Sequence, residues 1–350
     1  MEKYFAVIDA GRSEVAAIMA RRLKNGDCVF EALARVKSDA FNNGVVSDIV
    51  KASGSISEVL NKLIEKSGKK AQDVYAVVTS ASVERISSSG MVLLSKYGRE
   101  VRQRDISRCI DIASTVKIPL DKEPLHKIAR EFYIDGEKGI KNPIDLEGVK
   151  LGVDVNILTI NSSVLNNMSK CIAHAGFVPT DFIFSGLASS YRFLNDEDRN
   201  MVTAIVNTHK DLTEIMIFDQ GTLADCRVFS YGTDEFVSKN GIIARSTLEN
   251  LYSEAVKLYG WENVQKIIIS GTGALFDELI ETSEQFFNIP VVAGICARKD
   301  YEELPPERAE YSAPLGVLDY LTHENKKNHI CTGSLKKLLS GAVKFIDKYF

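Results

Sequence analysis

The chain has 350 residues, of which 45% are hydrophobic and 26% are charged, and its formal net charge at pH 7 is −4. This length allows two domains with well-buried cores, and this charge excludes a strong electrostatic attraction to nucleic acid. The cysteines have no paired spacing, and no apolar run approaches the roughly 18 residues that span a bilayer. We therefore expect a cytoplasmic protein with reduced thiols and no metal site.

The first 80 residues are predicted to form three strands, a helix and a fourth strand. The turn Gly11-Arg12-Ser13 joins the first two strands, and Asn25-Gly26-Asp27 is a strong hairpin turn before the third. Ser55 and Glu58 have the spacing of a capping box, which predicts that the helix begins near Ser55. Its buried face is marked by apolar residues at helical intervals: Ile56, Val59, Leu60, Leu63 and Ile64. The strands are expected at residues 4–10, 14–22, 28–36 and 74–80.

The same order of elements returns about 200 residues later. Strands are expected at 203–206, 212–218, 222–229 and 266–270, with a helix over 246–260 and a final turn Gly271-Thr272-Gly273. This repetition predicts a duplicated α/β fold with a cleft between its halves. The charged turn at 207–211 is then the counterpart of Gly11-Arg12-Ser13, and both tips are expected to point into the cleft.

Motifs in this frame resemble the FtsA family of bacterial cell-division proteins, which have an actin-like fold. Residues 8–19 are similar to the first phosphate loop of that family, 268–279 to its adenosine loop, and 182–199 to the segment that connects its halves. Residues 87–159 resemble its inserted subdomain IC, and the short motifs "REFYIDG" and "GIKNP" are nearly identical to motifs of the family. The resemblance implies a duplicated actin/ribonuclease-H-like α/β fold with an FtsA-type inserted IC subdomain.

The resemblance also implies domain boundaries. Subdomain IA is expected at 1–85, continued by about 163–182 and 311–321, with IC at 86–162, IIA at 183–310, a linker at 322–332 and a C-terminal helix at 333–350. Only about 50 residues separate Phe218 from Gly271, too few for a further α/β subdomain beside the expected strand and helix, so subdomain IIB is predicted to be absent or vestigial. In the family IIB closes one side of the cleft and receives the tail of the tubulin-like protein FtsZ. We therefore expect FtsZ-tail binding to be weak or relocated.

The second phosphate hairpin departs from the family pattern Asp-x-Gly-Gly-Gly-Thr-Thr-Asp. His209, Lys210 and Asp211 stand where the three glycines let backbone N–H groups approach the phosphates, and Thr213 alone is unchanged. We expect no catalytic residue and no cofactor, with ATP and Mg²⁺ binding at best weakly. An ion pair between Arg12 and Asp211, or between Lys210 and Asp9, is expected across the cleft. A retained nucleotide site would comprise Asp9, Gly11, Arg12, Ser13, Lys210, Thr213, Gly271, Thr272 and Gly273.

The C-terminal segment is basic, whereas the rest of the chain is acidic. Residues 322–350 contain six lysines and two acidic residues, a local charge of +4, so the remainder carries −8. From residue 333 the apolar side chains fall within about 160° of a helical wheel, and the polar ones face the other way. This pattern is typical of a helix in a membrane interface and resembles the membrane-targeting helix of FtsA. A terminal helix docked on its own domain is the alternative. The predicted membrane-binding residues are Leu335, Lys336, Lys337, Leu338, Leu339, Ala342, Val343, Lys344, Phe345, Ile346, Lys348, Tyr349 and Phe350.

The functional interpretation is a non-enzymatic FtsA-like scaffold that polymerises on the inner face of the cell membrane at the division site. Its expected partners are an anionic membrane surface, further copies of the chain and divisome proteins, with no nucleic acid. One alternative is an ATP-dependent actin-like polymer with a retained nucleotide site. Another is a paralogous membrane scaffold that does not bind FtsZ and contacts other proteins through the inserted subdomain.

Overall fold

The computed structural model describes residues 3–42, 44–237, 244–294 and 308–327. The chain forms two compact units, the first from residues 1–86, 118–128 and 156–323, and the second containing residues 87–117 and 129–155. The range 86–162 expected for the inserted subdomain includes these residues of the second unit, together with residues 86, 118–128 and 156–162 of the first. Within the described ranges, no helix combines the length and apolar character needed to cross a bilayer.

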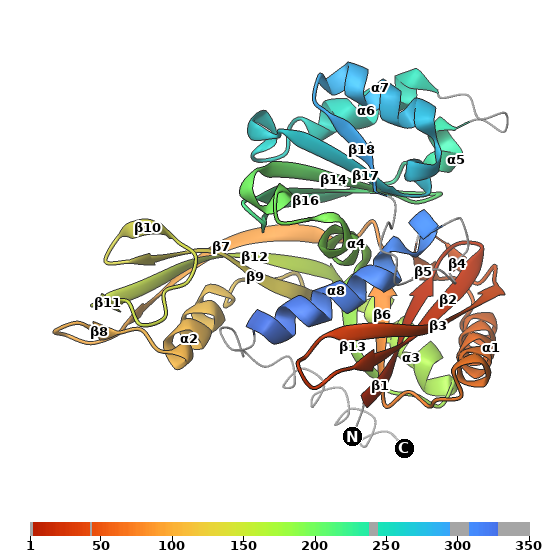
Figure 1. Ribbon diagram of the computed structural model, residues 1–350, viewed down its shortest axis with the longest axis horizontal. Coiled ribbons are helices and arrows are strands. Elements are labelled where there is room, and N and C mark those ends of the chain that lie inside the picture. The colour runs from red at the N-terminus through yellow and green to blue at the C-terminus, as the bar shows by residue number, and fades with distance from the viewer. Residues whose placement is uncertain (1–2, 43, 238–243, 295–307, 328–350) are drawn as a thin grey trace. The chain divides into compact units, whose positions relative to one another are not determined.

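The first lobe of the first unit is a five-stranded sheet in the order β13-β6-β1-β2-β3. Its central strand β1 (Lys3–Ala10) runs antiparallel to β2 and parallel to β6. Because side chains alternate along a strand, Ala6 and Ile8 join the core under the helices α1 and α3, whereas Phe5 and Val7 pack with α8 on the opposite face (Figure 1). The other strands are β2 (Glu14–Arg22), β3 (Cys28–Lys37), β6 (Asp73–Val78) and β13 (Pro179–Phe184), and the helices are α1 (Ile49–Ser67), α3 (Ser162–His174) and α8 (Ser312–Lys327). A small hairpin of β4 (Phe41–Asn42) and β5 (Val45–Val46) precedes α1.

The start of α1 differs from the sequence prediction. The helix begins at Ile49, six residues before Ser55, and the Asp48 carboxylate caps it by accepting the Lys51 N–H. Ser55 lies inside the helix, and its hydroxyl donates to Ser38. The capping-box spacing was therefore misleading, because an aspartate placed earlier already satisfies the free N–H groups.

The second lobe of the first unit repeats this plan with a sheet in the order β16-β15-β14-β17-β18. The helices α6 (Arg245–Ala255) and α7 (Asp277–Phe287) cover one face, and Met216 and Phe218 on the other face share a core with Leu187 of α4 (Ser185–Phe193). The predicted duplication of β-β-β-α-β order is confirmed. The strands are β14 (Val202–Thr208), β15 (Thr213–Asp219), β16 (Thr222–Phe229), β17 (Lys266–Gly271) and β18 (Val291–Ala293). The described residues between β16 and β17 form α5 (Thr233–Phe236), α6 and a 3-10 turn.

The second unit contains most of a four-stranded sheet in the order β10-β9-β12-β7, with α2 (Gln103–Ala113) packed on it. Gly90 lies so close to the end of α2 that a Cβ atom there would be 2.5 Å from the Ala113 nitrogen. The strands are β7 (Glu84–Leu93), β9 (Lys122–Ile134), β10 (Glu137–Ile140) and β12 (Lys150–Asn161), with a separate pair of β8 (Arg99–Glu100) and β11 (Glu147–Gly148).

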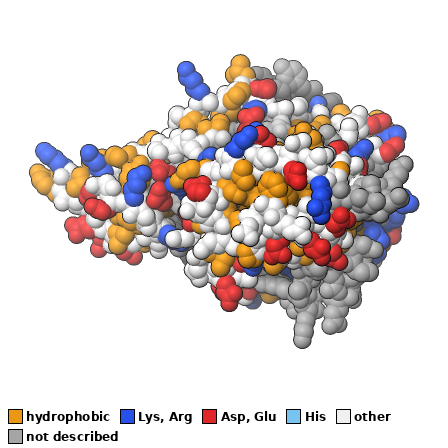
Figure 2. Space-filling model, turned by 90° about the horizontal axis from the view of Figure 1, so that it is seen from above, with side chains coloured by type: hydrophobic (Ala, Val, Ile, Leu, Met, Phe, Trp, Pro, Cys, Tyr) orange, Lys and Arg blue, Asp and Glu red, His pale blue; other side chains and the backbone are white. Residues whose placement is uncertain are grey.

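The C-terminal predictions are only partly covered by the described residues. Helix α8 continues to Lys327, so the first six residues of the expected linker are helical. Every predicted membrane-binding residue lies at 328–350, outside the described residues. On the face in Figure 2, basic and acidic side chains are interspersed and form no field of a single sign.

Candidate functional site

The two hairpin tips that were expected to meet do so within the first unit. The turn after β1 is closed by a hydrogen bond from Gly11 N–H to the Glu14 carbonyl, 2.9 Å long. The turn after β14 is shorter than predicted, because Asn207 and Thr208 belong to the strand and pair with Glu214 and Thr213. The turn is closed by a hydrogen bond from the His209 N–H to the Leu212 carbonyl, with Lys210 and Asp211 at its tip.

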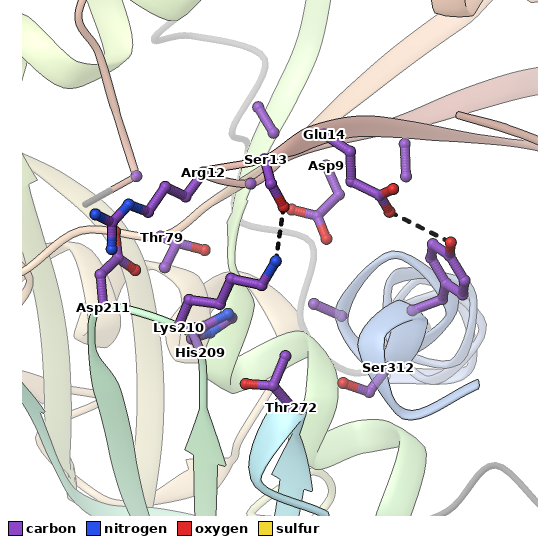
Figure 3. Close-up of a pocket in the computed structure, with 17 residues that line it drawn as sticks. Asp9, Arg12, Ser13, Glu14, Thr79, His209, Lys210, Asp211, Thr272 and Ser312 are labelled. Atoms are coloured by element: carbon purple, nitrogen blue, oxygen red, sulfur yellow. Dashed lines mark hydrogen bonds between the residues drawn. The ribbon is translucent and has the colours of Figure 1, made fainter. Parts of the chain in front are cut away.

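A cavity of about 160 Å³ lies between the tips (Figure 3). Seven of the nine residues predicted for a retained nucleotide site line it: Asp9, Gly11, Arg12, Ser13, Lys210, Gly271 and Thr272. The other two do not. Thr213 is buried and its hydroxyl donates to the Tyr231 carbonyl at 2.8 Å, while Gly273 packs against Thr208.

His209 lines the cavity, and its ring also joins a buried polar network. Its Nε2 lies 3.3 Å from Glu214 Oε2 and 3.0 Å from Asn207 Nδ2. Glu214 is fully buried and also accepts hydrogen bonds from Asn207 and from the Ser185 hydroxyl at the start of α4. Burial lowers the pKa of His209, but the carboxylates of Glu214, Asp9 and Asp211 outweigh it and raise the pKa above its usual 6.5.

Asp9 is a buried carboxyl group that lines the cavity. Its burial raises the pKa to about 6; the nearby His209 opposes this rise, and Glu214 and Glu14 add to it. Close to neutral pH this group therefore carries a proton more often than an exposed aspartate does.

Two contacts join the two lobes beside the cavity. Lys210 Nζ donates to Ser13 Oγ at 2.8 Å, and Arg12 Nη1 lies 2.6 Å from Asp234 Oδ2. The expected pairing of Lys210 with Asp9 is therefore replaced by a bond to Ser13. Arg12 points toward Asp211 (Figure 3), and its ion pair with Asp234 was not predicted. Asp234 lies on α5, whose Gly-Thr-Asp-Glu start is a helix N-terminal signal that the sequence already contained.

Other lining residues were also missed. Glu14, Thr79, Tyr311 and Ser312 face the cavity. The Tyr311 hydroxyl donates to Glu14 at 3.3 Å and accepts a hydrogen bond from Arg35 at 3.1 Å. No sequence pattern links Glu14 to Tyr311, since 297 residues separate them.

The residues present do not fit Mg-ATP. Ligand cavities usually measure about 300–1,000 Å³, whereas this cavity measures about 160 Å³. The side chains of His209 and Lys210 stand where glycines would expose backbone N–H groups, and Asp9, Glu14 and Asp211 add negative charge toward any phosphate. Within the described residues, no group of three His, Cys, Asp or Glu side chains could hold a metal ion.

Comparisons of the sequence with known proteins consistently find similarity to FtsA proteins. The family described as "SHS2 domain inserted in FTSA" matches residues 80–159. The chain is 32% identical over 215 residues to the cell division protein FtsA of Borreliella burgdorferi, covering 61% of this chain and 52% of that protein. It is 25% identical over 256 residues to the FtsA of Pseudomonas aeruginosa, with 73% and 60% covered, and 26% identical over 359 aligned positions to that of Neisseria meningitidis, with 100% and 82% covered.

The first two of these alignments span little more than half of the relatives' own length. Among solved structures, the "PilM-PilN type IV pilus biogenesis complex" has a TM-score of 0.64 at 13% identity and covers 91% of this chain and 98% of that one. This likeness concerns the fold alone. The predicted fold class, a duplicated actin-like α/β fold with an FtsA-type inserted subdomain, is confirmed, and the matched family describes the insertion as an SHS2 domain.

Proposed function

Because this chain is an FtsA-like protein with an inserted SHS2 domain, we propose that it is a cell-division scaffold that assembles on the cytoplasmic membrane. The SHS2 match over residues 80–159 carries the proposal, since it links the chain to relatives that are cell division proteins. The basic amphipathic pattern of residues 333–350 supplies the membrane contact, and many such segments in one filament would bind by avidity.

The proposed role is assembly and adhesion without nucleotide turnover. The small cavity and the side chains of His209 and Lys210 support it. FtsZ is not included among the proposed partners, because the described residues between β16 and β17 form only α5, α6 and a 3-10 turn. Other divisome proteins and further copies of the chain remain the proposed partners.

Mg-ATP is expected to show no binding in the low micromolar range. The reason is that His209 and Lys210 occupy the region where phosphates would lie, and the cavity is about 160 Å³. Isothermal titration calorimetry on the full chain tests this, and a crystal soaked in nucleotide gives the structural check. Triphosphate density between residues 9–13 and 207–213 would revive the ATP-dependent polymer.

Membrane binding is expected to require residues 333–350. Four lysines on the polar face contribute on the order of 1 kcal/mol each near an anionic surface, and salt weakens this attraction. We expect a chain ending at Thr332 to lose co-sedimentation with anionic vesicles by at least about tenfold. Leu339→Glu and Ile346→Glu should do the same, because each places a charge on the apolar arc.

Ser340→Glu on the opposite face is the matched control and should bind nearly as well as the unchanged chain. Equal pelleting of the full and truncated chains would favour a docked terminal helix instead. Electron microscopy of the full chain on lipid monolayers, with and without ATP, then tests for filaments. Filaments that form only with ATP would contradict the proposed function.

A further inference from the structure

The contacts between the hairpin tips are the basis of the inference. Lys210 of the second tip donates to Ser13 of the first at 2.8 Å (Figure 3). Arg12 of the first tip pairs with Asp234, which lies beside the second tip, at 2.6 Å. Each lobe therefore supplies one cation that reaches a partner on the other lobe. We call these two contacts the hairpin latch.

On the second lobe, backbone hydrogen bonds hold the residues of the latch in place. The N–H groups of Thr233 and Asp234 donate to the carbonyls of His209 and Lys210 at 2.9 and 2.8 Å, so α5 is bonded directly to the tip. Gly232 makes this approach feasible, because a Cβ atom there would lie 2.4 Å from the Lys210 carbonyl group. The position of the Asp234 carboxylate relative to Lys210 is thus set by main-chain contacts.

On the first lobe, backbone hydrogen bonds likewise fix the turn that carries Arg12 and Ser13. Gly11 N–H closes the first turn on the Glu14 carbonyl, and Ser38 N–H donates to the Ser13 carbonyl at 3.1 Å. Ser13 and Arg12 therefore project from a fixed turn rather than from a free loop. Both partners of the ion pair remain about half exposed, at 45% and 48%.

We infer that the hairpin latch holds the two lobes of the first unit closed with no nucleotide bound. In a two-lobed protein that binds a ligand in its cleft, the ligand bridges the lobes and shifts them toward closure. Here Lys210 and Arg12 make that bridge themselves. The lobes already share a core through α4, where Leu187 packs with Met216 and Phe218, so the latch has only to restrain the mouth of the cleft.

The consequence for assembly rests on the proposed scaffold function. Because side chains of the protein itself close the cleft, the closed conformation of the first unit is populated without nucleotide. Filament assembly would therefore not require nucleotide binding. The latch is nevertheless modest and adjustable. An exposed ion pair shifts an equilibrium by no more than about fivefold, and salt screens it.

The test reverses the charges of the ion pair in the full chain. Spin labels on Lys62→Cys of α1 and Glu281→Cys of α7 report the separation of the lobes by pulsed electron paramagnetic resonance. The protein used for labelling also carries Cys28→Ser, Cys296→Ser and Cys331→Ser. Without nucleotide and at low salt we expect one narrow distance distribution. Arg12→Asp and Asp234→Arg should each increase the long-distance population about two- to tenfold, because attraction becomes repulsion.

The double variant Arg12→Asp with Asp234→Arg should return the distribution toward that of the unchanged chain. Arg227→Asp is the matched control, since its exposed pair with Glu254 lies within the second lobe, and it should change nothing. A broad distribution that narrows only with Mg-ATP, or one that ignores the reversals, would overturn the latch. Vesicle co-sedimentation of the same variants is independent of lobe separation, so failure of the latch and failure of the membrane proposal are distinguishable.

Discussion

Asp225→Ala is expected to lower the free energy of unfolding of the first unit by about 3 kcal/mol, the low end of the range for breaking a buried ion pair. Asp225 Oδ1 lies 2.5 Å from Arg85 Nε, and the two side chains are only 10% and 19% exposed. The same carboxylate accepts the N–H groups of Cys226 and Tyr259 at 2.7 and 2.9 Å. Alanine would therefore leave a buried guanidinium without this carboxylate and two amides without their acceptor.

The measurement is urea denaturation followed by tryptophan fluorescence, because the single tryptophan, Trp261, is buried in the second lobe. Glu254→Ala is the control: its exposed carboxylate pairs with Arg227 and Lys257, and its removal should leave the midpoint nearly unchanged. Equal shifts for the two variants would show that the Arg85–Asp225 pair contributes no more than a surface pair.

Asp9→Asn is expected to stabilise the protein, and the gain should depend on pH. The folded-state pKa of Asp9 is raised to about 6 from 3.8. The folded chain therefore holds this proton more tightly than the unfolded chain, and the corresponding stability is present below pH 3.8 and lost as the pH rises through about 6. The loss amounts to about 1–3 kcal/mol above pH 6, since each unit of pKa corresponds to about 1.4 kcal/mol.

An amide at position 9 does not ionise, so Asp9→Asn should match the unchanged chain near pH 4 and melt at a higher temperature above pH 6. Differential scanning fluorimetry at several pH values measures this difference. Asp39→Asn is a control of opposite sign, because the Lys51 ammonium lowers the pKa of that exposed carboxyl group. A gain for Asp9→Asn that stays constant from pH 4 to pH 8 would contradict the assignment.

The periodic parts of the fold could be predicted from the sequence because their signals are local. The alternation along β1 follows from the two-residue period of a strand, and the turn residues Gly11-Arg12-Ser13 mark where it ends. The start of α1 could not be placed in the same way. Asp48 and Ser55 are both good caps, and only the folded chain decides between them.

The site shows a similar division between local and non-local signals. The side chains at 209–211, where the pattern of the FtsA family has glycines, can be read from the sequence, and they indicate a changed hairpin. The position of the His209 ring depends on Glu214, which is also bonded to Ser185 of helix α4. The partner of Arg12 depends on α5, placed by the close approach of Gly232 to Lys210. Such contacts arise from tertiary packing, which sequence periodicity does not describe.

Helix α8 also determines how the first lobe would respond to mechanical load. Its sixteen residues extend about 24 Å, from Ser312 at the cavity to Lys327, where the chain continues to its C-terminus. Asp319 is bonded to the nearly buried Arg192 at 2.8 Å, and the Thr322 hydroxyl accepts the Cys28 N–H at 3.0 Å. Because α8 lies along the sheet and is bonded at several points, a pull on its end loads these bonds together in shear. A tether attached through a loop would instead peel them one at a time.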